Sequence, residues 1–316
     1  LSGTTNPLIP IFAQTFLSAA IAPLAYVIAK RLGASERISR LAAVFAAMDP
    51  ASIAISLTLQ AETLSNIFIA LALLFFVLLV KSPGIRASIA CSVCIALAAL
   101  ARPNALYFAI VVAILIVWIV PQWQAKLGAF LVVFVVAVMP WYLRNYTYNN
   151  VFMFSSVGNF NLLFYKAVSV KHWATGEKPT DIEEQLAYEV DKRLGIEKPR
   201  ETYDYSSKWK FLVSNDAETV SIIRNMAFET YLEFPWTYVM VAPIHLVKLL
   251  AFSNLFVSMG NVRWLELFFN IVLYSLALLG CLLFSKKHML QWMCVTALPI
   301  LYFLLIPLIS GGVQDT

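Results

Sequence analysis

Apolar runs long enough to cross a lipid bilayer constrain the fold of this chain more than any other feature. About 20 apolar residues span the hydrocarbon core as a helix. Of the 316 residues, 60% are hydrophobic and only 13% are charged, and the mean hydropathy is +0.77. Soluble domains average about 45–50% apolar and about 25% charged residues. We therefore predict an all-α polytopic membrane protein.

The apolar runs divide the chain into four regions. We expect about six transmembrane helices in residues 1–146 and two more in residues 263–316. Residues 147–235 hold most of the eighteen acidic residues and predict an external polar segment with amphipathic helices. The expected spans are Pro7–Ala29, Leu41–Leu59, Thr63–Val80, Ala87–Ala101, Leu106–Val120, Leu127–Val138, Leu265–Phe284 and Leu290–Ile309.

Residues 236–262 form the fourth region, which contains Pro243, His245 and Lys248. A full crossing here would upset the alternation of the later spans between the two sides of the membrane. We therefore predict an interfacial or re-entrant helix in residues 236–262.

Basic residues orient the spans, because cytoplasmic loops carry an excess of Lys and Arg. This rule assigns one group to the cytoplasm: Lys30, Arg31, Arg37, Arg40, Lys81, Arg86 and Lys126. Glu62, Arg102 and Arg144 then fall at span ends on the opposite, external face. Three ionisable residues on one face indicate a candidate site. The N-terminus is external in this orientation, so we expect an earlier span, and we interpret the chain as an internal fragment.

The stretch Met139–Tyr146 lies where the apolar region gives way to the polar segment. It contains Trp141, Tyr142, Arg144 and Asn145. An arginine beside aromatic rings at a membrane surface suits a lipid phosphate or pyrophosphate. The alternative is an aromatic-belt anchor with an arginine that reaches the headgroups.

Three ionisable residues, Glu62, Asp49 and Arg102, each have more than one interpretation. Glu62 could orient an acceptor hydroxyl, bind a cation or cap a helix N-terminus. Asp49, before Pro50, is costly to bury in charged form, so it is neutral, faces an aqueous cavity or marks a broken span. Arg102 precedes Pro103 and could equally anchor a turn.

The polar segment carries clear helix signals. Thr180 to Glu183 reads as a capping box, and the spacing of Ile182, Leu186, Val190 and Leu194 predicts an amphipathic helix that ends at Gly195. A second helix is predicted over Asp216–Phe234. The stretch that follows Tyr146 suits an ordered loop.

Several kinds of site are not indicated. Cys91 and Cys94 lie in an apolar run without further ligands, which favours helix packing. His172 and His245 lack paired ligand spacing, so we predict no metal site; a divalent cation remains possible without support from any ligand motif. We expect no cofactor, and no nucleic-acid partner because no dense basic face is present.

Four motifs together resemble a known family. They are P-x-x-I-x-x-S-x-x-L-x-x-E-T-L from Pro50 to Leu64, L-A-A-L-A-R-P at 97–103, P-W-Y-L-R-N-Y at 140–146 and S-G-G at 310–312. In this order they resemble GT-C-fold glycosyltransferases that use polyprenyl-phosphate sugars, of the protein-mannosyltransferase and lipid A aminoarabinose-transferase type. The resemblance implies a GT-C-like helix bundle in the plasma (inner) membrane, with an active site facing the exterior or periplasm.

The resemblance also implies roles for the residues singled out above. A polyprenyl-phosphate-linked sugar, a hexose or a pentose, is the donor, and the acceptor is a protein, a lipid or a glycan. Arg102 and Arg144 would bind the donor phosphate, and Glu62 would line the acceptor side. Trp141, Tyr142, Asn145 and Asp49 would contribute to the lipid and sugar pocket. The family's principal catalytic acid belongs to an earlier loop, so we expect the main general base outside this sequence.

Two alternatives remain open. A transporter or flippase would predict polar residues near mid-membrane and broken helices in paired halves, of which only Asp49-Pro50 offers a sign. A structural membrane scaffold would predict no convergence of Glu62, Arg102 and Arg144.

Overall fold

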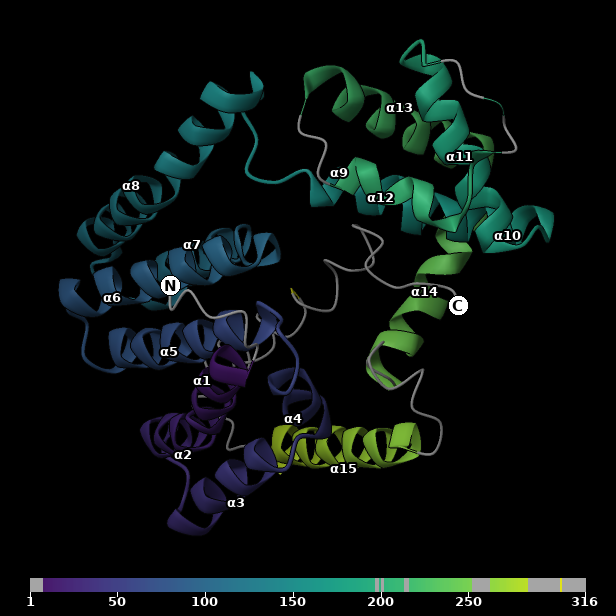
Figure 1. Cartoon of the computed structure of the whole chain (residues 1–316). Coiled ribbons are helices and arrows are strands. Elements are labelled where there is room, and N and C mark those ends of the chain that lie inside the picture. Colours follow the sequence, from purple (N-terminus) through teal and green to yellow (C-terminus); the bar gives the residue numbers. More distant parts are fainter. Residues whose placement is uncertain are drawn as a thin grey trace. The chain divides into compact units, whose positions relative to one another are not determined.

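The computed structural model describes residues 8–196, 199, 202–212, 216–251, 262–283 and 302. These residues form helices and no strand (Figure 1). The chain divides into two compact units. The first comprises Leu1–Met139 and Ala251–Tyr302, and the second comprises Pro140–Leu250 and Phe303–Thr316.

The first unit contains the apolar helices. They are α1 (Leu8–Ala19), α2 (Ile21–Leu32), α3 (Glu36–Ala47), α4 (Pro50–Ser56), α5 (Glu62–Lys81), α6 (Ile85–Ala101), the short η1 (Pro103–Ala105), α7 (Phe108–Ile119) and α15 (Val262–Leu283). Helix α8 (Trp123–Asn149) begins in this unit, and the boundary between the units falls within it, at Pro140.

Among the described residues, three helical segments are long and apolar enough to cross a membrane: Leu8–Leu32, α5 and α8. Helices α3 and α4 would make a fourth span as a pair bent by 47°. The apolar helices α6 and α7 are shorter, as is the apolar part of α15. The all-helical structure with these spans confirms the predicted polytopic membrane class. The expected span Leu290–Ile309 and the motif at 310–312 lie outside the described residues.

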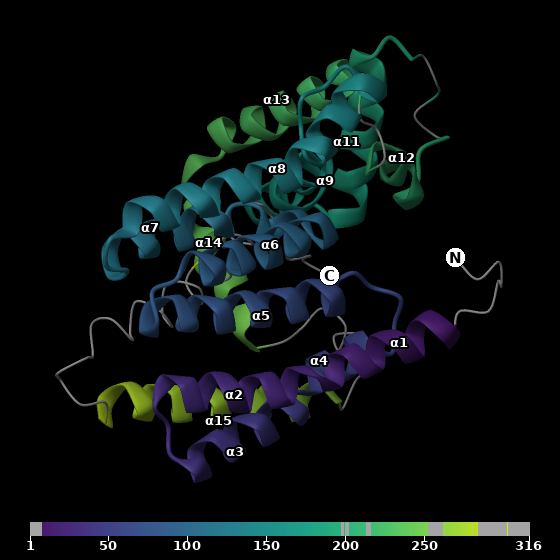
Figure 2. The same ribbon diagram turned by 90° about the vertical axis from the view of Figure 1, so that its left-hand side faces the viewer.

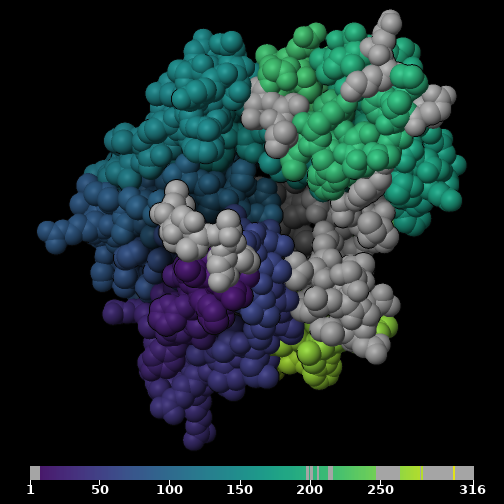
Figure 3. Space-filling model, viewed as in Figure 1, coloured from purple at the N-terminus to yellow at the C-terminus, as the bar shows by residue number. Residues whose placement is uncertain are grey.

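An antiparallel hairpin of α5 and α6 forms the centre of the first unit, and α1 and α2 run along α5 (Figure 2). Helix α6 is rich in Ala, Ser and Cys, and such small side chains let helix backbones approach closely in a membrane. Cys91 and Cys94 are free thiols buried in this packing, as the packing interpretation predicts. Helices α1 and α2 lie on the surface of the unit and contain no buried residue (Figure 3).

The second unit holds the polar segment. After the non-helical residues 150–156 come α9 (Val157–Asn161), the π-helical η2 (Leu162–Ala167), α10 (Val168–Thr175), α11 (Pro179–Arg193), η4 (Tyr205–Lys208), α12 (Trp209–Leu212), α13 (Ala217–Glu233) and α14 (Pro235–Ala251). The predicted ordered loop is therefore short, because α8 extends to Asn149 and helix resumes at Val157.

The core of this unit lies between η2, α11 and α13. Ile182, Leu186 and Val190 of α11 are buried in it, as their helical spacing predicts. Gly195, with a φ of +72°, follows the last turn of α11. At the start of α13 the Asp216 carboxylate accepts a hydrogen bond from the Thr219 amide at 2.8 Å.

The predicted capping box of α11 is wrong. Pro179 occupies the first turn, Lys178 is the N-cap residue without a side-chain cap, and the Thr180 hydroxyl contacts Asp181. Glu183 turns into the core instead, where its Oε2 lies 2.5 Å from Lys208 Nζ. Proline presets the helical φ without a cap, and the buried lysine needs a counter-ion, which together explain the outcome.

Helix α14 occupies the start of the predicted interfacial region. It contains Pro243 and exposes Trp236 and Met240, whereas Val241 and His245 are buried. Residues 252–261 of that region lie outside the described part of the chain. The interfacial placement of this segment stays a prediction.

Candidate functional site

Glu62 and Arg102 form an ion pair at one end of the α5–α6 hairpin. Helix α5 begins at Glu62 and α6 ends at Ala101, so the antiparallel arrangement brings the two side chains to the same end. Arg102 Nη1 lies 3.1 Å from Glu62 Oε1, and the arginine and glutamate side chains are 44% and 24% exposed. The pair therefore remains accessible to a ligand.

The backbone around Arg102 explains its position. The residue before a proline avoids the helical region, and Arg102 has an extended backbone with φ −139° and ψ 121° ahead of Pro103. Helix α6 must therefore stop at Ala101, and the guanidinium extends from the helix end. In the described contacts Glu62 engages only Nη1 of Arg102, and the guanidinium carries five N–H donors in all.

Hydrogen bonds to main-chain carbonyls tie α1 to the end of α4 and to the connection between α4 and α5. The Thr15 hydroxyl donates to Ile11 O at 2.9 Å and to Ser56 O at 3.2 Å. Gln14 Nε2 donates to Gln60 O, two residues before Glu62. These bonds fix the segment that precedes the ion pair against a surface helix.

Asp49 caps a helix. Its carboxylate accepts hydrogen bonds from the amide and the hydroxyl of Ser52, at the break between α3 and α4. Of the three interpretations of Asp49, the broken span matches this geometry. Its predicted part in a sugar pocket stays a prediction.

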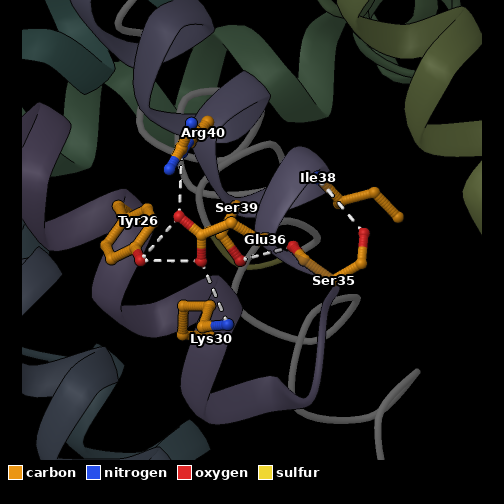
Figure 4. Close-up of polar contacts among 7 residues, drawn as sticks. All are labelled: Tyr26, Lys30, Ser35, Glu36, Ile38, Ser39 and Arg40. Atoms are coloured by element: carbon orange, nitrogen blue, oxygen red, sulfur yellow. Dashed lines mark hydrogen bonds and ion pairs between the residues drawn. The ribbon is translucent and has the colours of Figure 1, made fainter.

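Basic residues gather at the other end of the first unit's hairpin, where α5 ends and α2 turns into α3. In the turn between α2 and α3 the Glu36 carboxylate binds Lys30 Nζ at 3.2 Å, Arg40 Nε at 2.8 Å and the Tyr26 hydroxyl (Figure 4). Lys81 ends α5 at this end of the hairpin. Because Gln14 contacts Gln60, α1 and α2 run alongside α5 and carry Lys30 away from Glu62. The structure thus separates the basic turn from the Glu62–Arg102 pair, and the predicted sidedness of the two ends stays a prediction.

In the second unit, the predicted aromatic stretch fastens α8 to the non-helical residues that follow it. Trp141 Nε1 donates to Phe154 O at 3.0 Å, and Asn145 Nδ2 donates to Met153 O at 2.9 Å. The Tyr142 ring packs against Phe152, with ring centroids 5.0 Å apart, and against Phe154 at 5.4 Å. Three of the predicted pocket residues therefore hold the end of α8 in place.

Arg144 is exposed on the same stretch. Its guanidinium carbon lies 4.7 Å from the centre of the Trp141 ring and 5.6 Å from that of Tyr148, and Nη1 donates to Asn145 Oδ1 at 3.2 Å. A stacked arginine of this kind can bind a phosphate or reach lipid headgroups, so the geometry is compatible with both interpretations.

The structure thus places the candidates in two groups. Glu62, Arg102 and Asp49 belong to the first unit, and Arg144 with its neighbours belongs to the second. Glu62 and Arg102 are in direct contact. The convergence of Arg144 with that pair stays a prediction.

Buried polar pairs in the second unit were missed by the sequence reasoning. Glu183 pairs with Lys208, and Asp191 accepts a hydrogen bond from the Tyr203 hydroxyl at 2.5 Å and also binds Lys210. Their only sequence signal was acidic residues beside the apolar face of α11. Burial raises the pKa of Glu183, and burial likewise lowers the pKa of Lys208, while each partner opposes the other's shift.

His245 is buried in the second unit and its Nε2 lies 2.9 Å from the Ser169 hydroxyl. The described residues contain no group of three His, Cys, Asp or Glu side chains that could hold a metal ion.

We compared the chain with known protein families, curated proteins and solved structures. Residues 11–156 match the family described as dolichyl-phosphate-mannose-protein mannosyltransferase. No curated protein and no solved structure gives a significant match. The matched region is somewhat less than half of the chain, and the match agrees with the glycosyltransferase resemblance of the sequence motifs. The matched region includes Glu62, Arg102 and Arg144.

Proposed function

We propose that this protein transfers a mannosyl group from a polyprenyl-phosphate carrier of the dolichyl type to a hydroxyl group of a protein. The family match over residues 11–156 carries this proposal. The accessible Glu62–Arg102 pair supplies a site for the chemistry, at the hairpin end opposite the basic turn.

The transfer makes one bond and breaks one. The acceptor oxygen attacks the anomeric carbon of the sugar, and the bond from that carbon to the phosphate oxygen breaks. The carrier leaves as a phosphate monoester, and the proton of the acceptor hydroxyl passes to a general base. Negative charge grows on the leaving phosphate, so a guanidinium aimed at it stabilises the transition state.

Arg102 is our first candidate for that guanidinium. It is half-exposed, and Glu62 engages one of its nitrogens, which leaves other N–H groups for phosphate oxygens. We propose that Glu62 orients Arg102 and lines the acceptor side. Arg144 is an independent second candidate, because its stacked guanidinium is exposed at the end of α8.

We also propose that the reaction occurs on the external face of the plasma (inner) membrane. The basic turn between α2 and α3 would face the cytoplasm, and the Glu62–Arg102 end would face outward. Single cysteines introduced at Ser35 and at Asn104 test this placement. An impermeant thiol reagent applied to intact cells should label the Asn104→Cys variant and spare the Ser35→Cys variant.

The transporter alternative rests on the bent pair of α3 and α4. Transporters of this kind use broken helices in corresponding positions of two halves. The described residues contain one such bent pair, so the transferase reaction is the better supported function.

Transfer from a panel of polyprenyl-phosphate sugars tests the function with the full-length protein in membranes. We expect Arg102→Gln to lower the rate by about a hundredfold, which is roughly 2.7 kcal/mol of transition-state stabilisation. Glu62→Gln should lower it by a similar factor. Arg86→Gln, at the basic end of α6, is the matched control and should retain the wild-type rate. Comparable rates in all three variants would remove Glu62 and Arg102 from the site.

A further inference from the structure

Two polar atoms near the start of α5 are buried and have no hydrogen-bond partner within the part of the chain that the structure describes. They are Thr63 Oγ1 and Gln14 Oε1. Thr63 is 3% exposed and follows Glu62 in sequence, while the other end of the Gln14 amide contacts Gln60 O. Thr63 is thus next to Glu62 in the chain, and Gln14 is bonded to the residue two positions before Glu62. A buried polar atom without a partner destabilises the fold, so each of these two atoms needs an explanation, and a bound group is one that the position near Glu62 favours.

Neighbouring polar side chains do not share this property. The Thr15 hydroxyl donates to two carbonyl groups, and the Ser65 hydroxyl donates to Ala98 O at 3.3 Å. These hydroxyl groups face main-chain carbonyls of the helix packing, so the packing accounts for them. It does not account for Thr63 and Gln14.

The two atoms identify the chemistry of the ligand. Gln14 must present its nitrogen to the Gln60 carbonyl, because two oxygens would repel, so its other end is an oxygen that only accepts hydrogen bonds. The Thr63 hydroxyl both donates and accepts. A phosphate or carboxylate oxygen offers Gln14 no hydrogen, whereas a hydroxyl group satisfies both side chains.

We propose that Gln14 and Thr63 bind hydroxyl groups of the donor's sugar, beside the arginine that binds its phosphate. This inference rests on the proposed function for the identity of the ligand as a carrier-linked sugar. It assigns α1 and the first turn of α5 to sugar recognition. The two residues set affinity and choice of sugar and take no part in bond cleavage.

Binding measurements separate this inference from catalysis. We would measure the affinity of the purified full-length protein, in lipid nanodiscs, for polyprenyl-phosphate mannose and for the same polyprenyl phosphate without sugar. The wild type should bind the sugar-bearing lipid about tenfold more tightly, the effect of roughly one good hydrogen bond. Thr63→Val and Gln14→Leu should each remove most of this preference and leave affinity for the sugar-free lipid unchanged.

Matched variants control for packing. Thr15→Val removes a hydroxyl that already has protein partners, and should keep the wild-type preference for the sugar-bearing lipid. Thr63→Ser keeps the hydroxyl and should also keep it. Should Thr63→Val fail to fold, Gln14→Leu and Thr63→Ser still decide the question.

The outcomes separate the two proposals. Equal binding of both lipids by the wild type would overturn the inference, as would a preference that survives in both Thr63→Val and Gln14→Leu. A preference lost in these variants, in a protein that transfers no sugar to any acceptor, would support the inference and refute the proposed function.

Discussion

Two ion pairs, each between a glutamate and a basic side chain, lie in different surroundings in the two units. Glu62 and Arg102 meet at the exposed end of two helices of the first unit, with side chains 24% and 44% exposed. Glu183 and Lys208 meet in the core of the second unit, with side chains 8% and 1% exposed. Both pairs join segments that are distant in sequence.

The difference in solvent exposure indicates that the exposed pair can serve a function and that the buried pair stabilises the fold. An exposed ion pair contributes about 0–1 kcal/mol to stability, because water and salt screen it. Its side chains can therefore bind a ligand at little cost to the fold. A buried pair has lost its water, and removal of one partner leaves an uncompensated charge in the core. We therefore expect changes at Arg102 to affect transfer and changes at Lys208 to affect folding.

The largest expected effect is on the buried pair. Lys208→Met should lower the free energy of unfolding by about 3–5 kcal/mol, because Glu183 stays buried without its partner. Urea denaturation of the purified protein followed by circular dichroism measures this loss. The double variant Glu183→Leu with Lys208→Met should recover most of it. Lys192→Met, at an exposed pair with Glu189, is the control and should change stability by less than about 1 kcal/mol.

The converse applies to the exposed pair. Arg102→Gln, which should cost about a hundredfold in transfer, should change the free energy of unfolding by less than about 1 kcal/mol. The same denaturation experiment checks this. A stability loss as large as that of Lys208→Met would show that the Glu62–Arg102 pair is structural and would end the contrast between the two pairs.

A third effect concerns Tyr203, whose hydroxyl donates to Asp191 in the second unit. Burial, followed by the hydrogen bond to Asp191 and then by the charge of that residue, raises the pKa of Tyr203 to about 12 from 10.0. The raised folded-state pKa means that this stabilisation is complete below about pH 10 and is lost as the pH rises through about 12. Tyr203→Phe should cost about 1.5 kcal/mol at pH 8. Absorbance titration at the tyrosinate band should show one ionisation near pH 12 in the wild type that is missing from the Tyr203→Phe variant.

The smallest expected effect is at the surface of the second unit. Arg193 binds Glu229 through two nitrogens, at 2.9 and 2.8 Å, and joins α11 to α13. The guanidinium lowers the pKa of Glu229 below its usual value. Glu229→Gln should therefore destabilise by about 0.5 kcal/mol at neutral pH, and the difference from wild type should vanish as the pH falls through the folded-state pKa of Glu229. A difference that persists after that carboxyl is protonated would point to a cause other than charge.

Much of the helical structure could be predicted because its signals are local. The apolar runs up to Val138 each coincide with a helix or a helix pair, and Asp49-Pro50 marks the observed break between α3 and α4. Asp216 and Gly195 lie at helix ends as predicted. Where local signals competed, the prediction was wrong. The Thr180–Glu183 capping box does not form, because the helix begins at Pro179 and Glu183 binds Lys208 instead.

Only part of the candidate site could be predicted from the sequence. Glu62 and Arg102 stood out as ionisable residues at span ends, whereas Thr63 and Gln14 carried no signal in the sequence. A threonine or glutamine in an apolar run looks the same whether or not a neighbour satisfies it. Only the packing of α1 against the α4–α5 connection separates the satisfied Thr15 hydroxyl from the unsatisfied Thr63 hydroxyl.

By itself, the sequence determined the helical membrane class and, through its motifs, the glycosyltransferase resemblance. Length and hydropathy act over single segments, and a bilayer leaves such segments no alternative to the helix. The tertiary structure decided which charges pair, which are buried and which stay accessible. Those outcomes depend on partners distant along the chain, such as Ser169 and His245, which are separated by 76 positions and meet at 2.9 Å.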